Sequence, residues 1–204
     1  MTPPDWLPLL PTTATVGSVI AAGFYAAYTI RHNREIARMR ATLDLIEKAE
    51  SSEFYRELIR VFRRALAQKD VTKRVPVDQL LNPQTPEEVD QRLKILFFLN
   101  HYELIAAGFR NGVLDSSFYA DYMRGAAVHD WTVVKEFVYR MREPEPGGHP
   151  HPNTIYEHFE TLADEWAWET RHEGKLRAQG KSEAQIRRAI AVFRANPKMT
   201  RPPA

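Results

Sequence analysis

Three polar residues between positions 100 and 142 are of types that could do chemistry together. Asn100 and Glu103 lie three positions apart on a predicted helix, and Arg142 follows on a later one. A carboxylate beside an amide and a guanidinium group can act as a general acid or base. No nucleophile, metal or phosphate-binding motif accompanies them, so the pattern favours buried hydrogen-bonding partners that fix helix register. An enzyme that uses Glu103, Asn100 and Arg142 is the less favoured alternative.

Signals for a metal or cofactor are weak elsewhere in the sequence. Glu169-x-x-His172 has the spacing found in di-iron bundles, but those bundles need a second such pair and two further glutamates. The chain contains no cysteine, which excludes disulfides, thiolate nucleophiles and zinc–thiolate sites. We therefore expect no cofactor and no metal, and we predict that the protein is not an enzyme.

The elements that must position these residues have the pattern of α-helices. Apolar side chains recur at helical spacing, capping boxes begin two segments at Thr85 and Ser182, and no segment alternates like a strand. The predicted fold class is all-α, with one N-terminal transmembrane helix followed by a cytoplasmic bundle of five or six helices. The predicted regions are 1–30, the N-terminal segment and transmembrane helix; 31–50, a basic juxtamembrane helix; 51–172, the helical bundle; and 173–204, a basic C-terminal helix and tail.

An uncharged run from Trp6 to Ile30 is the basis for the transmembrane prediction, because about 20 apolar residues span a bilayer. Arginines follow this run and nothing basic precedes it. The positive-inside rule then places the N-terminus outside and residues 31–204 in the cytoplasm. Small residues at helical spacing would let the helix pack closely against another in lipid: Gly17, Ser18, Ala21, Ala22, Gly23, Ala26 and Ala27.

Charge is distributed unevenly behind a net value of +2. Residues 31–74 carry a net +5, residues 75–172 a net −8, and residues 173–204 a net +6. The basic segments are expected to contact anionic lipid headgroups or a protein partner: Arg31, Arg34, Arg38, Arg40, Arg187, Arg188 and Arg194. We expect no nucleic acid, because the acidic middle opposes it and no aromatic platform accompanies the basic residues.

A short apolar seam follows the predicted membrane helix. Ile36, Met39, Leu43 and Ile46 repeat at the 3-4-3 spacing of a coiled coil. Two heptads are fewer than the three or four that define a coiled coil. Packing of this helix on its own domain is therefore slightly favoured over homo-oligomerisation.

Several motifs resemble an uncharacterised bacterial and phage family. They are Ala41–Asp44, Asn100–Gly108, Asn111-Gly112, Leu114-Asp115, Trp131, Arg142 and Phe159-x-x-Leu162-x-x-x-Trp166. Family members are similar in layout, with a short N-terminal membrane helix, an arginine-rich stretch and a helical domain of unknown function. The resemblance covers residues 31 to 168 and implies no activity.

These features together predict a single-pass, membrane-anchored helical interaction protein. It would be an accessory or scaffold subunit of a membrane-associated complex, with a protein partner or a homo-oligomer as its assembly. The alternative is a membrane-tethered sensor or effector that acts through oligomerisation of the apolar seam.

Overall fold

The structure, a computed structural model, describes residues 9–68, 70–143 and 154–195, with side chains from residue 18 to residue 193 of these ranges. Within them the regular elements are all helical, so the predicted all-α class is confirmed. The elements are α1 (Leu9–Ser51), α2 (Glu53–Ala65), the 3₁₀ turn η1 (Val71–Lys73), α3 (Val77–Leu81), α4 (Pro86–Arg110), α5 (Ser116–Arg142), α6 (Glu157–Ala178) and α7 (Glu183–Ala195).

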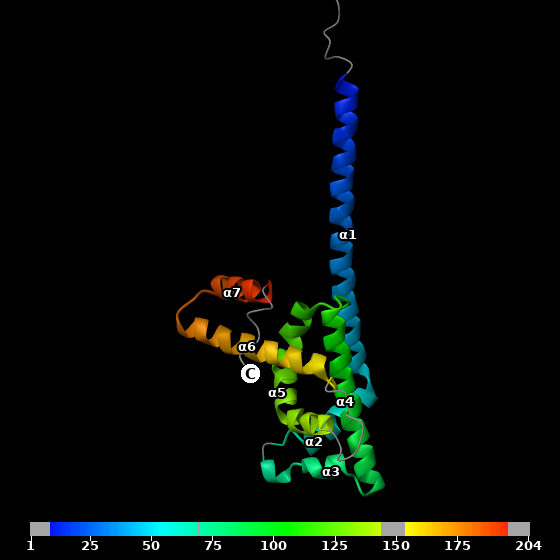
Figure 1. Cartoon of the computed structure of the whole chain (residues 1–204), viewed down its shortest axis with the longest axis vertical. Coiled ribbons are helices and arrows are strands. Elements are labelled where there is room, and N and C mark those ends of the chain that lie inside the picture. Colours follow the sequence, from blue (N-terminus) through cyan, green and yellow to red (C-terminus); the bar gives the residue numbers. More distant parts are fainter. Residues whose placement is uncertain (1–8, 69, 144–153, 196–204) are drawn as a thin grey trace, which may run out of the picture.

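The helices form a body at one end of a long projecting helix (Figure 1). The C-terminal part of α1 packs on α2 and α5, while its N-terminal part extends away from the body. Helices α2, α4, α5 and α6 enclose the core, and α7 turns back to lie against α6. The region boundary predicted at residue 30 falls inside α1, and the one predicted at residue 172 falls inside α6.

The predicted transmembrane helix is contradicted. No helix among the described residues combines the length and the apolarity needed to cross a bilayer. The uncharged stretch is diluted by polar groups such as Thr29, whose hydroxyl donates to the carbonyl of Tyr25. The single-pass topology and the bacterial inner-membrane location are overturned with it.

The residues predicted to pack within the membrane therefore lose that role. Ser18, Ala21, Ala22, Gly23, Ala26 and Ala27 are exposed on the projecting part of α1. The side chain of Gly17 lies outside the described residues. A methyl group added at Gly23 would meet no other atom within 4 Å, so nothing in the chain itself requires a glycine there.

A buried polar contact fixes α1 to the start of α5. Thr42 is fully buried, and its hydroxyl donates to the carbonyl of Arg38 while accepting the backbone N–H of Asp115 at 2.8 Å. Arg38 donates from Nη2 to the carbonyl of Leu114. Asp115 in turn caps α5 by accepting the N–H of Phe118. Arg38 and Thr42, one turn apart on α1, thus position the N-cap of α5, which lies more than 70 positions later in the chain.

Helix α4 is the central element of the body, and its sequence determines where it begins. Thr85 accepts the backbone N–H of Glu88, and the Glu88 carboxylate accepts the N–H of Thr85, which confirms the predicted capping box. The second predicted box is also present, between Ser182 and Gln185 at the start of α7. The buried face of α4 contributes Ile95, Phe98, Leu99, Tyr102, Ile105 and Ala106 to the core.

Gly108 is required by the close approach of α4 to the loop that follows it. A Cβ atom at this position would lie 2.7 Å from Cδ1 and 3.0 Å from Cγ of Leu114, which is buried. We expect Gly108→Ala to lower the free energy of unfolding by about 1–3 kcal/mol, the usual effect of overpacking. Urea denaturation of purified protein measures this value.

Gly125 offers the matched control for that substitution. It lies inside α5, and an added Cβ there meets nothing within 4 Å. Gly125→Ala should raise the free energy of unfolding by about 0.5–1 kcal/mol, because alanine favours a helix over glycine. Equal effects of the two substitutions would show that Leu114 does not pack against Gly108.

Candidate functional site

The predicted pair Glu103 and Arg142 lies at the N-terminus of α6. The Glu103 carboxylate accepts the backbone N–H groups of His158 at 3.2 Å and Phe159 at 2.9 Å. These belong to the first turn of α6, whose N–H groups have no partner within the helix. Arg142 donates from Nε and Nη2 to the carbonyl of Ile155 at 2.9 and 2.6 Å.

This arrangement explains an unusual backbone conformation. Tyr156, the residue before α6, has φ of 59° and is buried, although left-handed backbone is costly for a residue other than glycine. Its side chain gives no cap to the helix, so Glu103 supplies the cap from α4. Arg142 also donates to the Glu160 carboxylate at 2.6 Å. We refer to Glu103, Arg142 and Glu160 with their backbone partners as the α6 clamp.

Asn100 is not part of this group, contrary to the prediction. It lies exposed on α4, whereas Glu103 is half-buried at the edge of the core. The structure therefore brings together two of the three predicted polar residues. Both are engaged by backbone groups of α6, which is the register-fixing role that the sequence favoured.

A second polar group lies among aromatic rings inside the body. The Tyr102 hydroxyl donates to Asp130 Oδ2 at 2.9 Å, and the Tyr55 and His101 rings lie 4.5 Å apart between centroids. Burial raises the pKa of Asp130 and lowers the pKa of His101 to about 4. Among the described residues, no three His, Asp or Glu side chains gather where they could hold a metal ion.

Protonation of His101 should make folding depend on pH. Burial lowers the pKa of this imidazole from 6.5 to about 4, so between these values the unfolded chain binds a proton that the folded chain does not. Stability is therefore complete above about pH 6.5 and decreases as the pH falls towards 4. The contribution of His101 should decrease by about 2 kcal/mol between pH 7 and pH 5.

Urea denaturation at several pH values measures this contribution as the difference between wild type and His101→Gln. The difference isolates His101 because Asp130 and the other acids titrate in both proteins. His32 is exposed on α1, so His32→Gln is the control and should keep the wild-type pH profile. If the free energy of unfolding of His101→Gln depended on pH in the same way as that of wild type, the burial of a neutral imidazole would be contradicted.

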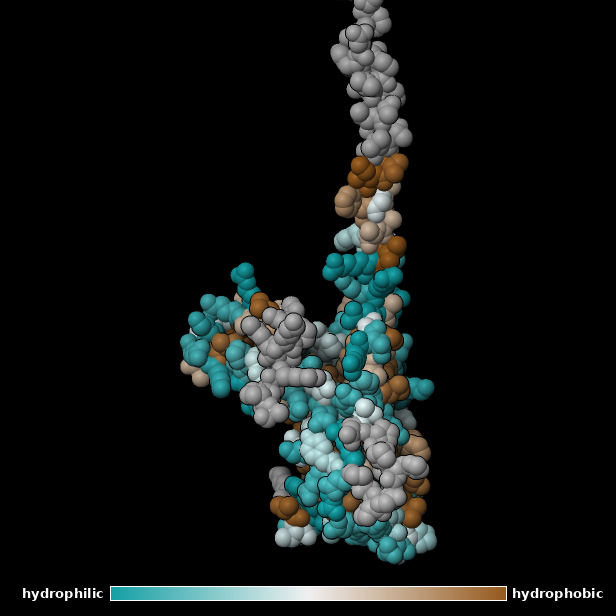
Figure 2. All heavy atoms as spheres, viewed as in Figure 1, coloured by the Kyte–Doolittle hydropathy of each residue, from teal (hydrophilic) through white to brown (hydrophobic). Residues whose placement is uncertain are grey.

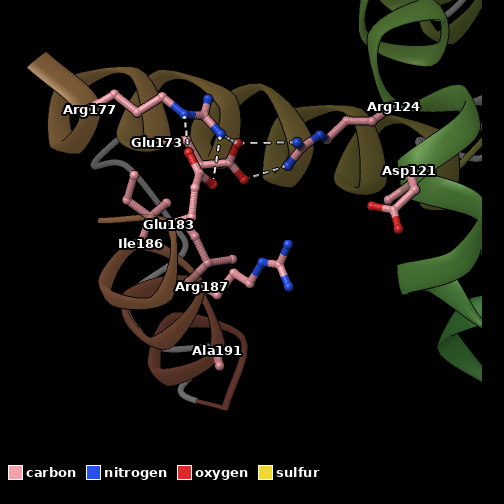
Figure 3. Close-up of a pocket in the computed structure, with 10 residues that line it drawn as sticks. Asp121, Arg124, Glu173, Arg177, Glu183, Ile186, Arg187 and Ala191 are labelled. Carbon is pink, nitrogen blue, oxygen red and sulfur yellow. Dashed lines mark hydrogen bonds and ion pairs between the residues drawn. The ribbon is translucent and has the colours of Figure 1, made fainter. Parts of the chain in front are cut away.

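A charged cleft of about 620 Å³ lies between α5, α6 and α7 (Figure 3). Arg124 of α5 makes a two-pronged contact with Glu173 of α6, at 2.8 and 3.2 Å, and lies 3.4 Å from the almost fully buried Glu169. Arg177 connects Glu173 to Glu183 at the start of α7. These ion pairs join α5 to α6 and α6 to α7, and Arg124 and Arg177 are already matched by carboxylates.

The predicted Glu169-x-x-His172 spacing is used within this part of the fold. Glu169 pairs with Arg124, and the His172 ring stacks on Trp168 at 4.6 Å. The Trp168 ring also stacks on that of Phe193 in α7, with 3.4 Å between the ring centroids. The E-x-x-H pair thus serves helix packing.

The predicted basic contact residues are not all alike. Arg31, Arg34 and Arg40 are exposed on α1, and Arg187 and Arg188 are exposed on α7. Arg187 extends into the charged cleft. Arg38 instead anchors α1 to the start of α5, and the side chain of Arg194 lies outside the described residues. Contact of the exposed arginines with anionic lipid or a protein partner stays a prediction.

The predicted apolar seam on α1 is divided by the fold. Ile46 packs against the core and Ile36 is half-buried, while Met39 and Leu43 remain exposed. The C-terminal part of this helix packs on its own body, which was the slightly favoured reading. A continuous four-residue seam is not available to a second copy.

An apolar stripe lies exposed on the face of α4 opposite the core. Val89, Leu93, Phe97 and Leu104 follow one another at helical spacing and are 43–68% exposed. Phe54 of α2 is 59% exposed and extends the row, with its ring 6.1 Å from that of Phe97. We call these five residues the α2–α4 stripe. Figure 2 shows apolar residues gathered along the edge of the body where α4 runs.

Comparison with known proteins places this architecture in a family. A domain of unknown function, DUF4760, matches residues 16–166. The chain belongs to the DUF4760 family. The match covers α4, the α6 clamp and most of α1, and it ends inside α6, so α7 and the carboxylate side of the charged cleft follow the DUF4760 region. No curated protein and no solved structure matches the chain. The resemblance to an uncharacterised family is thus confirmed for DUF4760, which itself implies no activity.

Sequence reasoning missed the α2–α4 stripe because it assigned the wrong face of α4 to the core. Leu93, Phe97 and Leu104 share one face of α4 with Asn100, and this apolar spacing by itself predicts a buried face. Helix α4 is apolar on two faces, and spacing alone does not say which one is covered. The aromatic run Phe97-Phe98, which puts a large ring on each face, is the signal that could have revealed it.

Proposed function

We propose that this DUF4760 protein is a helical interaction module, an accessory or scaffold subunit of a larger assembly, and not an enzyme. The observation that carries the proposal is the α2–α4 stripe, five large apolar side chains exposed along one face of a well-packed body, with the exposed Asn100 between Phe97 and Leu104. Contiguous exposed apolar patches of this kind mark surfaces that other molecules cover. Glu103 and Arg142 support it indirectly, because both are occupied in holding α6.

The partner of this surface is expected to be another helical protein. The stripe is straight, lies along one helix and spans about four turns, which suits an apolar helix face packed along it. A flat row of side chains at this spacing offers ridges and grooves to a helix, without the enclosed pocket that small molecules require. The proposal includes a bacterial or phage origin for this protein, as the sequence resemblance implies.

The native assembly of the tagged chain, purified from the organism that encodes it, tests the proposal. We expect wild type to be part of an assembly whose mass exceeds that of one chain, and Leu93→Lys/Phe97→Lys to lose it. Val71 and Val192 are exposed apolar residues far from the stripe in sequence, so Val71→Lys/Val192→Lys is the matched control. An assembly that survives the stripe variant, or that the control variant also loses, contradicts the proposal.

A further inference from the structure

We infer that the α2–α4 stripe pairs with the same stripe of a second copy, with the two α4 helices antiparallel about a two-fold axis near Phe97. This inference rests on the proposed function and names its partner. A two-fold contact uses one surface patch twice, so the patch must complement itself. The exposed area and the order of side chains along α4 both meet this requirement.

The exposed apolar area is sufficient for a dimer. The five side chains of the stripe are 43–68% exposed. With roughly 150–200 Å² for each fully exposed large side chain, they present about 500 Å² per copy. Two copies would bury about 1,000 Å² from these residues alone, which is the lower bound of a specific interface before flanking residues are added.

The order of side chains along α4 fits antiparallel pairing about Phe97. Val89 lies two turns before Phe97 and Leu104 lies two turns after it. A two-fold axis at Phe97 therefore places Val89 of one copy against Leu104 of the other. Phe54 adds a second ring beside Phe97, so four aromatic rings gather at the axis.

The mass of the full chain in solution is the first test. One chain has a mass of 23.6 kDa, and analytical ultracentrifugation should give twice this value for wild type and for Val71→Lys/Val192→Lys. Phe97→Lys should raise the dimer dissociation constant about 30-fold or more, as expected for an interface hot spot. A wild-type chain that remains a single copy at all concentrations overturns the inference.

Crosslinking tests the orientation, because the natural chain has no cysteine. Val89→Cys and Leu104→Cys chains, mixed and treated with a short bismaleimide, should form a mixed crosslinked pair, while each variant alone should not. Crosslinking of each variant to itself but not to the other would mean parallel packing and would overturn the antiparallel pair.

If the chain is a monomer while the stripe variant still loses a different protein from the native assembly, the proposed function stands and the second-copy inference fails.

Discussion

Phe98→Ala should lower the free energy of unfolding by about 3–5 kcal/mol, the cost of removing a buried aromatic side chain from a close-packed core. Phe98 is 2% exposed, and its ring lies 4.6 Å from Phe62 and 5.2 Å from Tyr102 between centroids. The cavity would open where α2 and α4 meet. Urea denaturation of the purified variant measures the loss.

The adjacent residue is the control. Phe97 has the same side chain on the same helix but is 52% exposed, so Phe97→Ala should change the stability of the single chain by less than about 1 kcal/mol. The comparison is made at low protein concentration, where a dimer does not contribute to stability. A larger loss for Phe97→Ala than for Phe98→Ala would mean that the buried and exposed faces of α4 are reversed.

The same two residues show what spacing can and cannot predict. The helical period and the Thr85 capping box were sufficient to place α4 and its first turn. The period and the capping box do not predict how α4 is rotated about its own axis, because Leu93 and Phe97 form one apolar face and Phe98 belongs to another. Only the positions of α2 and α6 decide which face is covered, and these are tertiary facts.

The N-terminal helix was misread for a related reason. Uncharged residues up to Ile30 were counted as a membrane span, although hydroxyls and glycine dilute them. Among the described residues no helix meets the requirements of a span. Helix α1 instead continues through Arg31 and Thr42 to Ser51 as one element that docks on α5. Absence of charge is a weaker signal than hydrophobicity, and it was given too much weight.

The candidate site was predicted in part, and the physical reason is the distance in sequence between its members. Glu103 was singled out as a half-buried carboxylate that needs partners, and it has them. The partners are backbone N–H groups more than 50 residues away. The identity of the side chains at those positions does not indicate that their N–H groups bind Glu103. Arg142 was expected as a hydrogen-bonding partner of this group, but its acceptors are the carbonyl of Ile155 and the carboxylate of Glu160.

Glu103→Ala should lower the free energy of unfolding by about 2–4 kcal/mol. The substitution leaves the N–H groups of His158 and Phe159 without an acceptor, and each buried unsatisfied group costs about 1–3 kcal/mol. Glu103→Gln keeps one carbonyl acceptor and should lose about half as much. Urea denaturation of both variants, with Glu157→Ala at an exposed position as control, measures the difference.

The effects of these variants on the free energy of unfolding distinguish a structural role of Glu103 in the α6 clamp from a catalytic role. A clamp requires that Glu103→Ala and Arg142→Ala both loosen the start of α6, because the two side chains hold neighbouring backbone groups around the left-handed Tyr156. Amide hydrogen exchange at Phe159 should then rise in both variants, while exchange in α2 changes only through the global loss of stability. Buried carboxylates kept for chemistry commonly destabilise the fold, so a more stable Glu103→Ala protein would return Glu103 to the list of catalytic candidates.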